Sequence, residues 1–483
     1  IARPTVYVNG LSCILPGGAN SLDLLWNEAS ASIDAVGEVP YTRWDVTSDH
    51  DASVSKRVVY GAFVSGADLF DNRAFGVSAA EGTAMDPQHR LVLEDGYRAL
   101  AAAGVDRMSL IDNANVGVAI GIYATEYMSL QAGWPQGRSV YAATNSLSIA
   151  AGRVSYTLGM QGPCLTVETA CSASLVACHV AMRSVQLNEC ASHLANGANL
   201  MLSPACSTYL AIAGMTSMWG RCLTYDDRAN GFGRGEGMAS VALAAGDEGK
   251  GVLRGGAVRQ DGRSASLTAP NGQAQQSLFR AAQEDTSIRA GDTMCVEAHG
   301  TGTALGDPIE TGSVSASLVS ATGVTPTLTG LKATIAHTES TAGLAGMVKL
   351  ALQLRRREAA PNVQLRNLNP KVFSAMGTKL QLAAFPVQTA QITMTDKCTG
   401  GVSSFGYAGS LAHSVLEYTA PTAGVAHTVV RYRRRAFPVR PDCPPPPVPK
   451  YKALYGMAWF ALSKVYDVHA HSRSYTILTH WPA

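Results

Sequence analysis

The chain has 483 residues, of which 46% are hydrophobic and 15% charged, and its net charge at pH 7 is +2. This length accommodates several ordinary domains or one large α/β unit, with enough hydrophobic residues for a sizeable core. A charge so close to zero argues against nucleic acid or a membrane surface as a partner. No apolar run reaches the about 18 residues of a membrane span. The nearest candidate, 451–466, is shorter and contains Lys452 and Lys464.

The ten cysteines are scattered without the spacing of a disulfide framework. We therefore expect reduced thiols in an intracellular compartment, cytoplasmic or organellar. No cysteine–histidine spacing resembles a metal site, so no metal is expected. The first residues, from Ile1, show no signal-peptide pattern and fit a processed product or an excerpt from a longer polypeptide.

Strand-like and helix-like runs alternate along the chain. Apolar residues at helical spacing, with Ser21 as an N-cap residue, mark the first helix. Helices are expected at Ser21–Ala29, Pro87–Ala102 and Met347–Arg356, and strands at Val6–Val8, Val116–Gly121, Pro163–Val167 and within 191–202. This alternation predicts a layered α/β fold.

Cys171 stands between a strand-like run, Pro163–Val167, and a helix-like run that starts near Leu175. The amino end of a helix lowers the pKa of a thiol and makes it reactive. The small residues on both sides of Cys171 leave room for a substrate to reach the sulfur. For one cysteine in isolation, a buried structural residue is the competing interpretation.

Two histidines favour the reactive interpretation. His299 lies in Val296-Glu297-Ala298-His299-Gly300-Thr301-Gly302-Thr303, and His337 lies in Leu331-Lys332-Ala333-Thr334-Ile335-Ala336-His337-Thr338-Glu339. Each follows an apolar strand-like run at the point where a loop begins, which is where side chains meet over a pocket. A lone histidine in such a place is more often structural, but two with a cysteine indicate a nucleophile and its partners.

With these segments, the chain resembles the β-ketoacyl synthase family, specifically the ketosynthase domains of type I polyketide or fatty-acid synthases. The resemblance runs from about Thr5 to about Thr419. Further matching stretches are Asp86–Leu91, Gly152–Tyr156, Gly231–Gly237, Gln260–Arg263, Thr268–Gly272 and Ser403–Gly406. The glycines of Gly231–Gly237 do not form a nucleotide-binding loop, because no strand-then-helix pattern surrounds them. For Gly231–Gly237 the resemblance instead implies a loop near the substrate entrance.

The resemblance implies a decarboxylative Claisen condensation. Cys171 would take an acyl group from a phosphopantetheine thioester, and the enolate of a malonyl-type thioester on an acyl carrier protein would attack it. His299 and His337 would stabilise the enolate oxygen, and Lys332 would tune this cluster electrostatically. A solvated surface lysine is the alternative for Lys332. No cofactor is expected beyond the phosphopantetheine that the carrier protein supplies.

The resemblance also implies an oxyanion hole made by the main-chain N–H groups of Cys171 and Phe405. Gly406 suits a close, mobile backbone approach beside the gating residue Phe405. Here the family's motif departs from its usual form, because Leu411 replaces an asparagine that could order the loop. A further set of polar residues is expected to line the pocket or contact pantetheine, with plain turn residues as the alternative: Thr301, Thr303 and Thr338. Asp226 and Asp227 are expected to form a solvated turn.

The implied fold is the thiolase-type α-β-α-β-α arrangement of two similar halves. We place the amino-terminal half at 5–250 and the carboxyl-terminal half at 251–420. Residues 421–483 follow as a linker and tail of unknown role: Arg431–Arg435 resembles an arginine-rich linker, and Pro444–Pro447 favours an extended chain. The family implies a homodimer, with the strand before Cys171 near the two-fold axis.

No acyltransferase serine motif, phosphopantetheine attachment motif or dinucleotide fingerprint is present. The expected partners are therefore an acyl carrier protein and other synthase domains or an acyltransferase acting in trans. The alternative to a condensing enzyme is a non-elongating or structural ketosynthase-like subunit. A thiolase shares the fold but usually needs a second active-site cysteine, which we do not find. Fatty-acid and polyketide pathways are not separated here, although the matching loops favour polyketide synthesis.

Overall fold

A computed structural model describes residues 3–46, 52–111, 114–123, 126–132, 141–246, 251–320, 323–392, 396–419 and 430–439. The strands are β1 (Val6–Ile14), β2 (Gly37–Glu38), β3 (Tyr60–Gly61), β4 (Leu69–Phe70), β5 (Val116–Ile122), β6 (Cys164–Val167), β7 (Ser192–Asn199), β8 (Gly237–Ala245), β9 (Val252–Gln260), β10 (Cys295–Glu297), β11 (Thr327–Thr329), β12 (Glu358–Ala359), β13 (Ala390–Gln391), β14 (Lys397–Phe405), β15 (Ser410–Thr419) and β16 (Arg435–Ala436). The helices are α1 (Leu22–Ser30), α2 (Ala52–Val58), α3 (Ala79–Ala84), α4 (Pro87–Ala102), α5 (Arg107–Ile111), α6 (Glu126–Ala132), α7 (Leu147–Leu158), α8 (Ala173–Gln186), α9 (Pro204–Ile212), α10 (Gly272–Thr286), α11 (Gly306–Ser317), α12 (Lys332–Ile335), α13 (Ala342–Arg356) and α14 (Pro370–Met376).

The large sheet is built from two halves with the same topology. Its order is β11-β10-β14-β15-β9-β1-β8-β7-β5-β6. Numbered along the chain within each half, both sets of five strands have the order 3-2-4-5-1. The halves join where Val6 and Tyr7 of β1 pair with Leu253 and Val252 of β9. This duplicated order confirms the expected thiolase-type arrangement of two similar halves.

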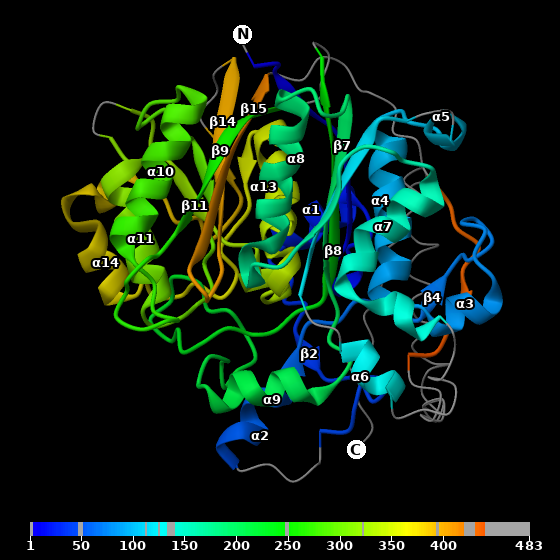
Figure 1. The fold of residues 1–483 in the computed structure, drawn as a ribbon. Helices are drawn as coiled ribbons and strands as arrows, with labels where there is room; N and C mark the ends of the chain where they lie inside the picture. The colour runs from blue at the N-terminus through cyan, green and yellow to red at the C-terminus, as the bar shows by residue number, and fades with distance from the viewer. Residues whose placement is uncertain are drawn as a thin grey trace, which may run out of the picture. The chain divides into compact units, whose positions relative to one another are not determined.

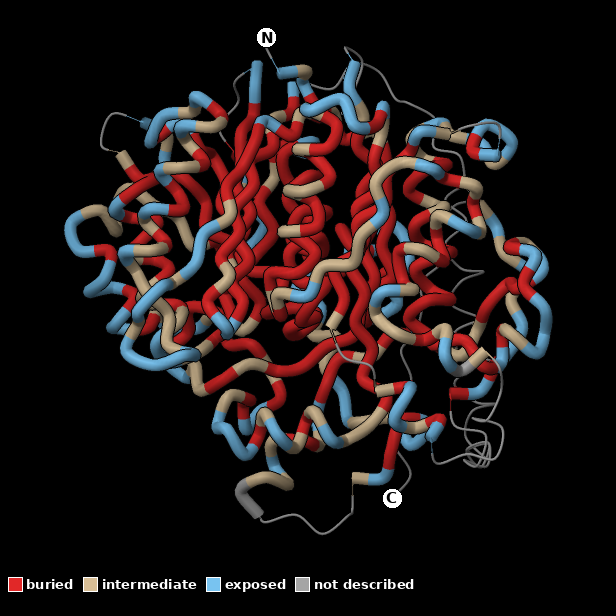
Figure 2. The backbone as a smooth tube through the Cα atoms, in the orientation of Figure 1, coloured by how far each residue is buried: buried red, intermediate tan, exposed pale blue. Residues whose placement is uncertain are grey.

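Helices separate and cover the two half-sheets, giving five layers (Figure 1). Helices α8 and α13 lie between the two half-sheets. Helices α4 and α7 cover the outer face of the amino-terminal half-sheet, and α10 and α11 cover the outer face of the carboxyl-terminal half-sheet. The burial pattern agrees, because the strands and the two central helices are the most buried parts of the chain (Figure 2).

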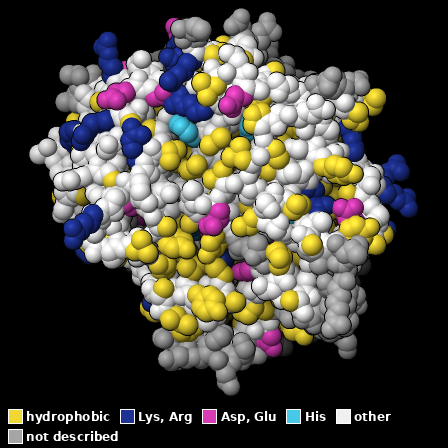
Figure 3. All heavy atoms as spheres, viewed as in Figure 1, with side chains coloured by type: hydrophobic (Ala, Val, Ile, Leu, Met, Phe, Trp, Pro, Cys, Tyr) yellow, Lys and Arg dark blue, Asp and Glu magenta, His cyan; other side chains and the backbone are white. Residues whose placement is uncertain are grey.

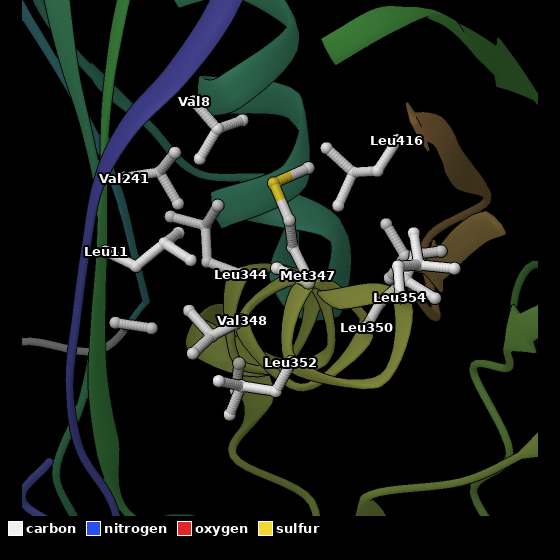
Figure 4. Packing of buried hydrophobic residues seen from close by; sticks show 14 of the residues in the cluster. Val8, Leu11, Val241, Leu344, Met347, Val348, Leu350, Leu352, Leu354 and Leu416 are labelled. Carbon is white, nitrogen blue, oxygen red and sulfur yellow. The ribbon is translucent and has the colours of Figure 1, made fainter. Parts of the chain in front are cut away.

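Helix α13 is buried on almost every side, and its one buried charge, Lys349, pairs with Glu297 at 2.8 Å. Leu344, Met347 and Val348 of α13 are fully buried and face β1, β8 and β15 (Figure 4). Every residue of α13 from Ala342 to Leu354 is buried, as expected for a helix in the middle of a large unit.

The predicted elements are confirmed with small shifts of their ends. Ser21 caps α1, because its Oγ accepts from the N–H of Leu24, and Asp86 caps α4 in the same way through Gln88. The helix expected to start at Met347 begins earlier, at Ala342. Strand β5 is buried along its whole length between two parallel neighbours, as a continuous apolar run predicts.

The expectation of a solvated turn at Asp226 is wrong. Its carboxylate is buried and accepts hydrogen bonds from the Arg228 side chain at 2.6 Å and from the main-chain N–H of Arg366 at 2.7 Å. It therefore ties two distant loops together. Asp227 beside it is exposed.

The segment 430–439 belongs to the same compact unit as the two halves. Its strand β16 pairs with β4, and Phe437 is buried against Phe70. The fully buried guanidinium of Arg90 donates to the main-chain oxygen of Phe437 at 2.8 Å. This segment, which includes the arginine-rich stretch 431–435, is thus part of the folded body. Pro444–Pro447 and 451–466 lie outside the described residues.

Candidate active site

The nucleophile candidate Cys171 lies in a 3-10 turn, Ala170–Ser172, that connects β6 to α8. The residue before it, Ala170, has φ +52°, a left-handed conformation that non-glycine residues rarely adopt. Gly121 of β5 lets this turn come close, because a Cβ there would lie 2.2 Å from the main-chain nitrogen of Ser174. The expected position of Cys171 at the amino end of a helix is therefore confirmed.

The expectation of a lowered thiol pKa is wrong for Cys171 in this structure. Burial and, to a smaller extent, the carboxylate of Glu339 raise its pKa to about 12, although Lys332 acts in the opposite direction. Desolvation disfavours the thiolate more than the helix end stabilises it. The resting side chain is a neutral thiol.

His299 follows β10 and is held by its neighbours in one orientation. Its Nδ1 accepts a hydrogen bond from the main-chain N–H of Phe405 at 3.2 Å. In a neutral ring the proton is then on Nε2, which remains as a donor. The position of His299 is set by Glu310, whose carboxylate accepts from the main-chain N–H groups of His299 and Gly300 at 2.7 and 2.9 Å.

Two carboxylates of α11 escaped a functional assignment at the sequence level. Asp307 accepts from the main-chain N–H groups of Gly302 and Tyr225 at 3.0 and 2.8 Å, beside the bonds made by Glu310. Because Asp307 and Glu310 are three residues apart, their carboxylates lie on the same face of α11. That face is turned to the loop that contains Gly300 and Gly302. That spacing after His299 was the signal that could have identified them.

His337, from the same carboxyl-terminal half, is fixed in the same way. Its Nδ1 accepts from the main-chain N–H of Glu339 at 3.1 Å, so the neutral ring carries its proton on Nε2. That Nε2 is buried without a partner among the described residues. The ring centroids of His299 and His337 are 5.5 Å apart. The main chain of His337 pairs with Gly233 and Gly235, which brings the predicted entrance loop to the site.

Burial holds the pKa values of both imidazoles well below their usual range, and Lys332 lowers both further. Lys332 is itself buried, at the start of α12, so the surface alternative for this residue is wrong. The ammonium group disfavours a second positive charge nearby. Both rings are therefore neutral at physiological pH.

A cleft of about 440 Å³ brings most of the predicted residues together. Cys171, His299 and His337 line it, with Thr301 and Thr303 on its wall. Thr338 is buried and does not belong to that wall. Hydrophobic side chains gather on the face that carries α9 (Figure 3), where Tyr209 and Ile212 are exposed.

At the end of β14, the main-chain N–H of Phe405 does not have the role that was expected of it. The N–H of Phe405 is used by His299, so the oxyanion donor expected from Phe405 is wrong. The main-chain N–H groups that favour negative charge on the Cys171 sulfur, and so lower its pKa, are those of Tyr407 and of Cys171 itself. Gly406 is required for close approach, because a Cβ there would lie 2.5 Å from the main-chain oxygen of Thr169.

A smaller cavity of about 40 Å³ adjoins the cleft and also contacts Cys171. We call it the inner cavity, and its lining consists of Tyr123, Ala170, Cys171, Leu210, Met215, Phe232, Glu339 and Tyr407. The Glu339 carboxylate is neutralised by Arg234, with N–O distances of 2.5 and 3.0 Å. The other side chains are mostly apolar, as expected of a site for an acyl chain.

The described residues contain no group of three or more metal-ligating side chains that could hold an ion. Among the described helices, none combines the length and hydrophobicity needed to cross a membrane. The nine described cysteines are all free thiols.

Comparison with known proteins places these residues in a family. Residues 3–248 match the β-ketoacyl synthase N-terminal domain, and residues 250–366 match its C-terminal domain. One component of the phenolphthiocerol/phthiocerol polyketide synthase of Mycobacterium tuberculosis is 37% identical over 439 residues, which are 88% of this chain and 28% of that protein. Another component of the same synthase is also 37% identical, over 88% of this chain and 20% of its own length. The chain thus spans about a quarter of the length of these curated relatives.

Solved structures agree with this assignment. An oxazolomycin ketosynthase domain from Streptomyces albus superposes with a TM-score of 0.81 at 29% identity, covering 88% of this chain and 76% of that one. The ketosynthase from module 6 of the bacillaene synthase of Bacillus subtilis gives 0.78 at 30% identity, covering 86% and 72%. The chain therefore belongs to the β-ketoacyl synthase family.

Proposed function

We propose that this chain is a condensing enzyme of polyketide biosynthesis that joins an acyl group on Cys171 to a malonyl-type thioester. The observation that carries this proposal is the convergence of one thiol and two neutral imidazoles on one cleft. Each imidazole keeps Nε2–H as a donor because a main-chain N–H occupies its Nδ1. The relatives of this chain are polyketide synthase components and ketosynthases, which supports the pathway.

The first step transfers an acyl group from a phosphopantetheine thioester to Cys171. The sulfur attacks the thioester carbonyl, and the tetrahedral oxyanion is stabilised by the N–H groups of Cys171 and Tyr407. The carbon–sulfur bond to pantetheine then breaks, and the proton lost by Cys171 leaves with the pantetheine thiol.

The second step makes the carbon–carbon bond. A malonyl-type thioester loses carbon dioxide, and its electron pair passes to an enolate whose oxygen accepts from Nε2–H of His299 and His337. The enolate carbon attacks the acyl carbonyl on Cys171. The intermediate collapses to a β-keto thioester and releases the Cys171 sulfur, which takes up one proton.

Neutral histidines suit this step. A donor hydrogen bond stabilises the enolate while it forms, and an uncharged ring does not hold the malonyl carboxylate in a tight ion pair. Burial lowers the pKa values of both rings, and the nearby Lys332 ammonium lowers them further, so the rings stay uncharged. Thr301 and Thr303 on the cleft wall are suited to contact a pantetheine arm.

The proposal implies an acyl carrier protein as partner, together with an acyltransferase or other synthase domains. We also propose that the chain forms a homodimer. Strand β6 stands at the end of the sheet and has one edge without a strand partner among the described residues. Such an edge can pair with the same strand of a second copy. The intracellular location expected from the cysteines remains a prediction.

The test is the intact mass of the protein after exposure to acyl-carrier thioesters, with Cys171→Ala as control. We expect one acyl adduct that is absent from the control and is discharged as a β-keto product by malonyl-carrier. An adduct that never elongates would identify a transfer-only enzyme. The absence of any adduct would overturn the assignment of Cys171 and favour a structural role.

A further inference from the structure

Glu297 and Lys349 form a buried ion pair where β10 meets the central helix α13. Nζ of Lys349 donates to Oε2 of Glu297 at 2.8 Å, and each of the two side chains is 2% exposed. Helix α13 comes this close because Gly346 has no side chain, and a Cβ there would lie 3.2 Å from Cγ of Glu297. A buried charge is costly unless it is paired, so the ammonium of Lys349 allows Glu297 to remain a carboxylate.

The Glu297 carboxylate also holds the start of the segment that carries Lys332. Its Oε1 accepts a hydrogen bond from the main-chain N–H of Leu331 at 2.6 Å, and its Oε2 accepts from the hydroxyl of Thr329 at 2.8 Å. Thr329 is the last residue of β11, and Leu331 directly precedes Lys332. One carboxylate thus ties together β10, the end of β11 and α13.

The segment from Leu331 to His337 is short, so its start decides where its functional side chains lie. It consists of the single turn α12, with Lys332 at its first position, and of Ala336, which has φ +57°. His337 follows, and its main-chain N–H donates to the oxygen of Gly233 at 2.7 Å. The segment is therefore held at two points, by the Glu297 carboxylate at one end and by the glycine-rich loop at the other.

We propose that Glu297 is a positioning residue for condensation, which holds Lys332 in register with His299. This inference rests on the proposed function, because it concerns the step in which the enolate forms. Through the N–H of Leu331 the carboxylate fixes the place of Lys332, while its own main chain continues along β10 toward His299. Cys171 lies on a different connection, between β6 and α8 of the amino-terminal half. Loss of the carboxylate should therefore slow condensation more than loading.

The experiment compares two substitutions of Glu297 in a Lys349→Met background of the full chain. Glu297→Gln keeps an acceptor oxygen at the same reach for the N–H of Leu331. Glu297→Met has a similar length but no strong acceptor. Neither double variant buries an unpaired charge. Denaturant titration verifies that both are folded before their rates are measured.

Single-turnover assays measure loading from an acetyl pantetheine thioester and elongation by malonyl-carrier protein. The variant with Glu297→Gln should elongate within about threefold of wild type. The variant with Glu297→Met should elongate about ten- to a hundredfold more slowly, because a small displacement of positioned groups is enough to slow a reaction. Loading should change by less than about threefold in both, since Cys171 shares none of these hydrogen bonds.

The pH profile of elongation gives a readout that a loss of packing does not move. Lys332 lowers the pKa values of both histidines. When Glu297→Met displaces Lys332, the rings protonate more readily and the acid limb moves to higher pH. All other charged or titratable groups that act on Lys332 or the rings are unchanged in these variants, namely Glu310, Cys222, Cys171 and Arg234.

Two single variants complete the test. Thr329→Val removes one donor to the carboxylate without changing a charge, so elongation should fall about threefold while loading is unaffected. Leu352→Ala, at a buried position of α13, is the control for lost packing, and both rates per folded protein should stay within about twofold.

Equal elongation by the two double variants would overturn the positioning role of Glu297. Equal losses of loading and elongation with Glu297→Met would overturn it as well, because they indicate a general defect of the fold. Both results would leave the assignment of Cys171 intact. A wild-type protein that loads no acyl group contradicts the proposed function instead.

Discussion

The main-chain N–H of Phe405 donates to Nδ1 of His299 across 3.2 Å, so the end of β14 sets the tautomer of a histidine at the end of β10. The His337 ring is set in the same way by the N–H of Glu339. Both rings therefore present Nε2–H to the cleft without a carboxylate partner. A donor that is already oriented costs no reorganisation when negative charge develops on a substrate oxygen.

Replacing His299 by alanine should separate the two half-reactions. We expect formation of the β-keto product to fall about 10²- to 10³-fold, which is typical for loss of one oriented oxyanion donor. Loading of Cys171 should persist, because its own oxyanion donors are the N–H groups of Cys171 and Tyr407. Single-turnover assays of loading and elongation measure the two rates. Equal loss of both would contradict this division of roles.

Cys171 should react slowly with iodoacetamide near neutral pH. Burial raises its pKa to about 12, and the thiolate is the reactive form. The alkylation rate should therefore keep rising up to about pH 10 without a plateau, when followed by peptide mass mapping. Cys171→Ala identifies the peptide, and the exposed Cys164 provides an internal comparison. A plateau below about pH 8 would mean that the thiol is already ionised at rest.

Lys332→Met should shift the acid limb of the condensation profile to higher pH. The lysine lowers the pKa values of His299 and His337, although burial is the larger cause. Without its charge the rings protonate more readily, so activity should be lost at a pH higher by about one unit. Lys371→Met, on the surface of α14, is the matched control. An unchanged acid limb would show that Lys332 does not act on the histidines electrostatically.

The titration of Glu310 should lower the free energy of unfolding as the pH rises from 4.5 to about 7. Burial raises its pKa from 4.5 to about 7, with opposing contributions from the N–H groups of Gly300 and His299. Between these values the folded state binds more protons than the unfolded state, so the free energy of unfolding falls with increasing pH. Denaturant titrations of Glu310→Gln from pH 4.5 to about 7 should give a flatter profile. A wild-type profile that rises with pH over this window and is unaffected by the substitution would be inconsistent with the structure.

Phe437→Ala should destabilise the body by about 3–5 kcal/mol, as expected for a buried phenylalanine. Phe437 is 3% exposed and covers the buried guanidinium of Arg90. Chemical denaturation measures the change. Phe373→Ala, at an exposed position, should cost less than about 0.5 kcal/mol. Similar small effects of both substitutions would mean that segment 430–439 is not part of the cooperative unit.

Local patterns in the sequence were enough to predict the fold class and the three residues, Cys171, His299 and His337, that meet in the cleft. Cys171 before a helix, and His299 and His337 after strands, are visible as changes of periodicity with glycine and threonine at the loops. The buried strands and helices were predictable because apolar spacing reflects which face is covered. Even the cap at Ser21 follows from a local preference that the structure confirms.

Contacts between distant segments decided the rest. The N–H group that favours negative charge on the Cys171 sulfur belongs to Tyr407 rather than Phe405, because the N–H of Phe405 donates to a histidine 106 residues away. Thr338 is buried away from the cleft, and Asp226 is buried beneath Arg228 and Arg366. These outcomes depend on which main-chain groups meet across the molecule.

The sequence by itself determined the chemistry that the chain carries: a thiol, two imidazoles and a lysine, each placed at the end of a regular element. Only the tertiary structure decided their protonation and orientation. Desolvation raises the pKa of Cys171 and lowers those of the histidines, and burial arises from packing that no short segment contains. The Nε2–H of His299 is oriented only once β10 and β14, about a hundred residues apart in the chain, are neighbours in one sheet.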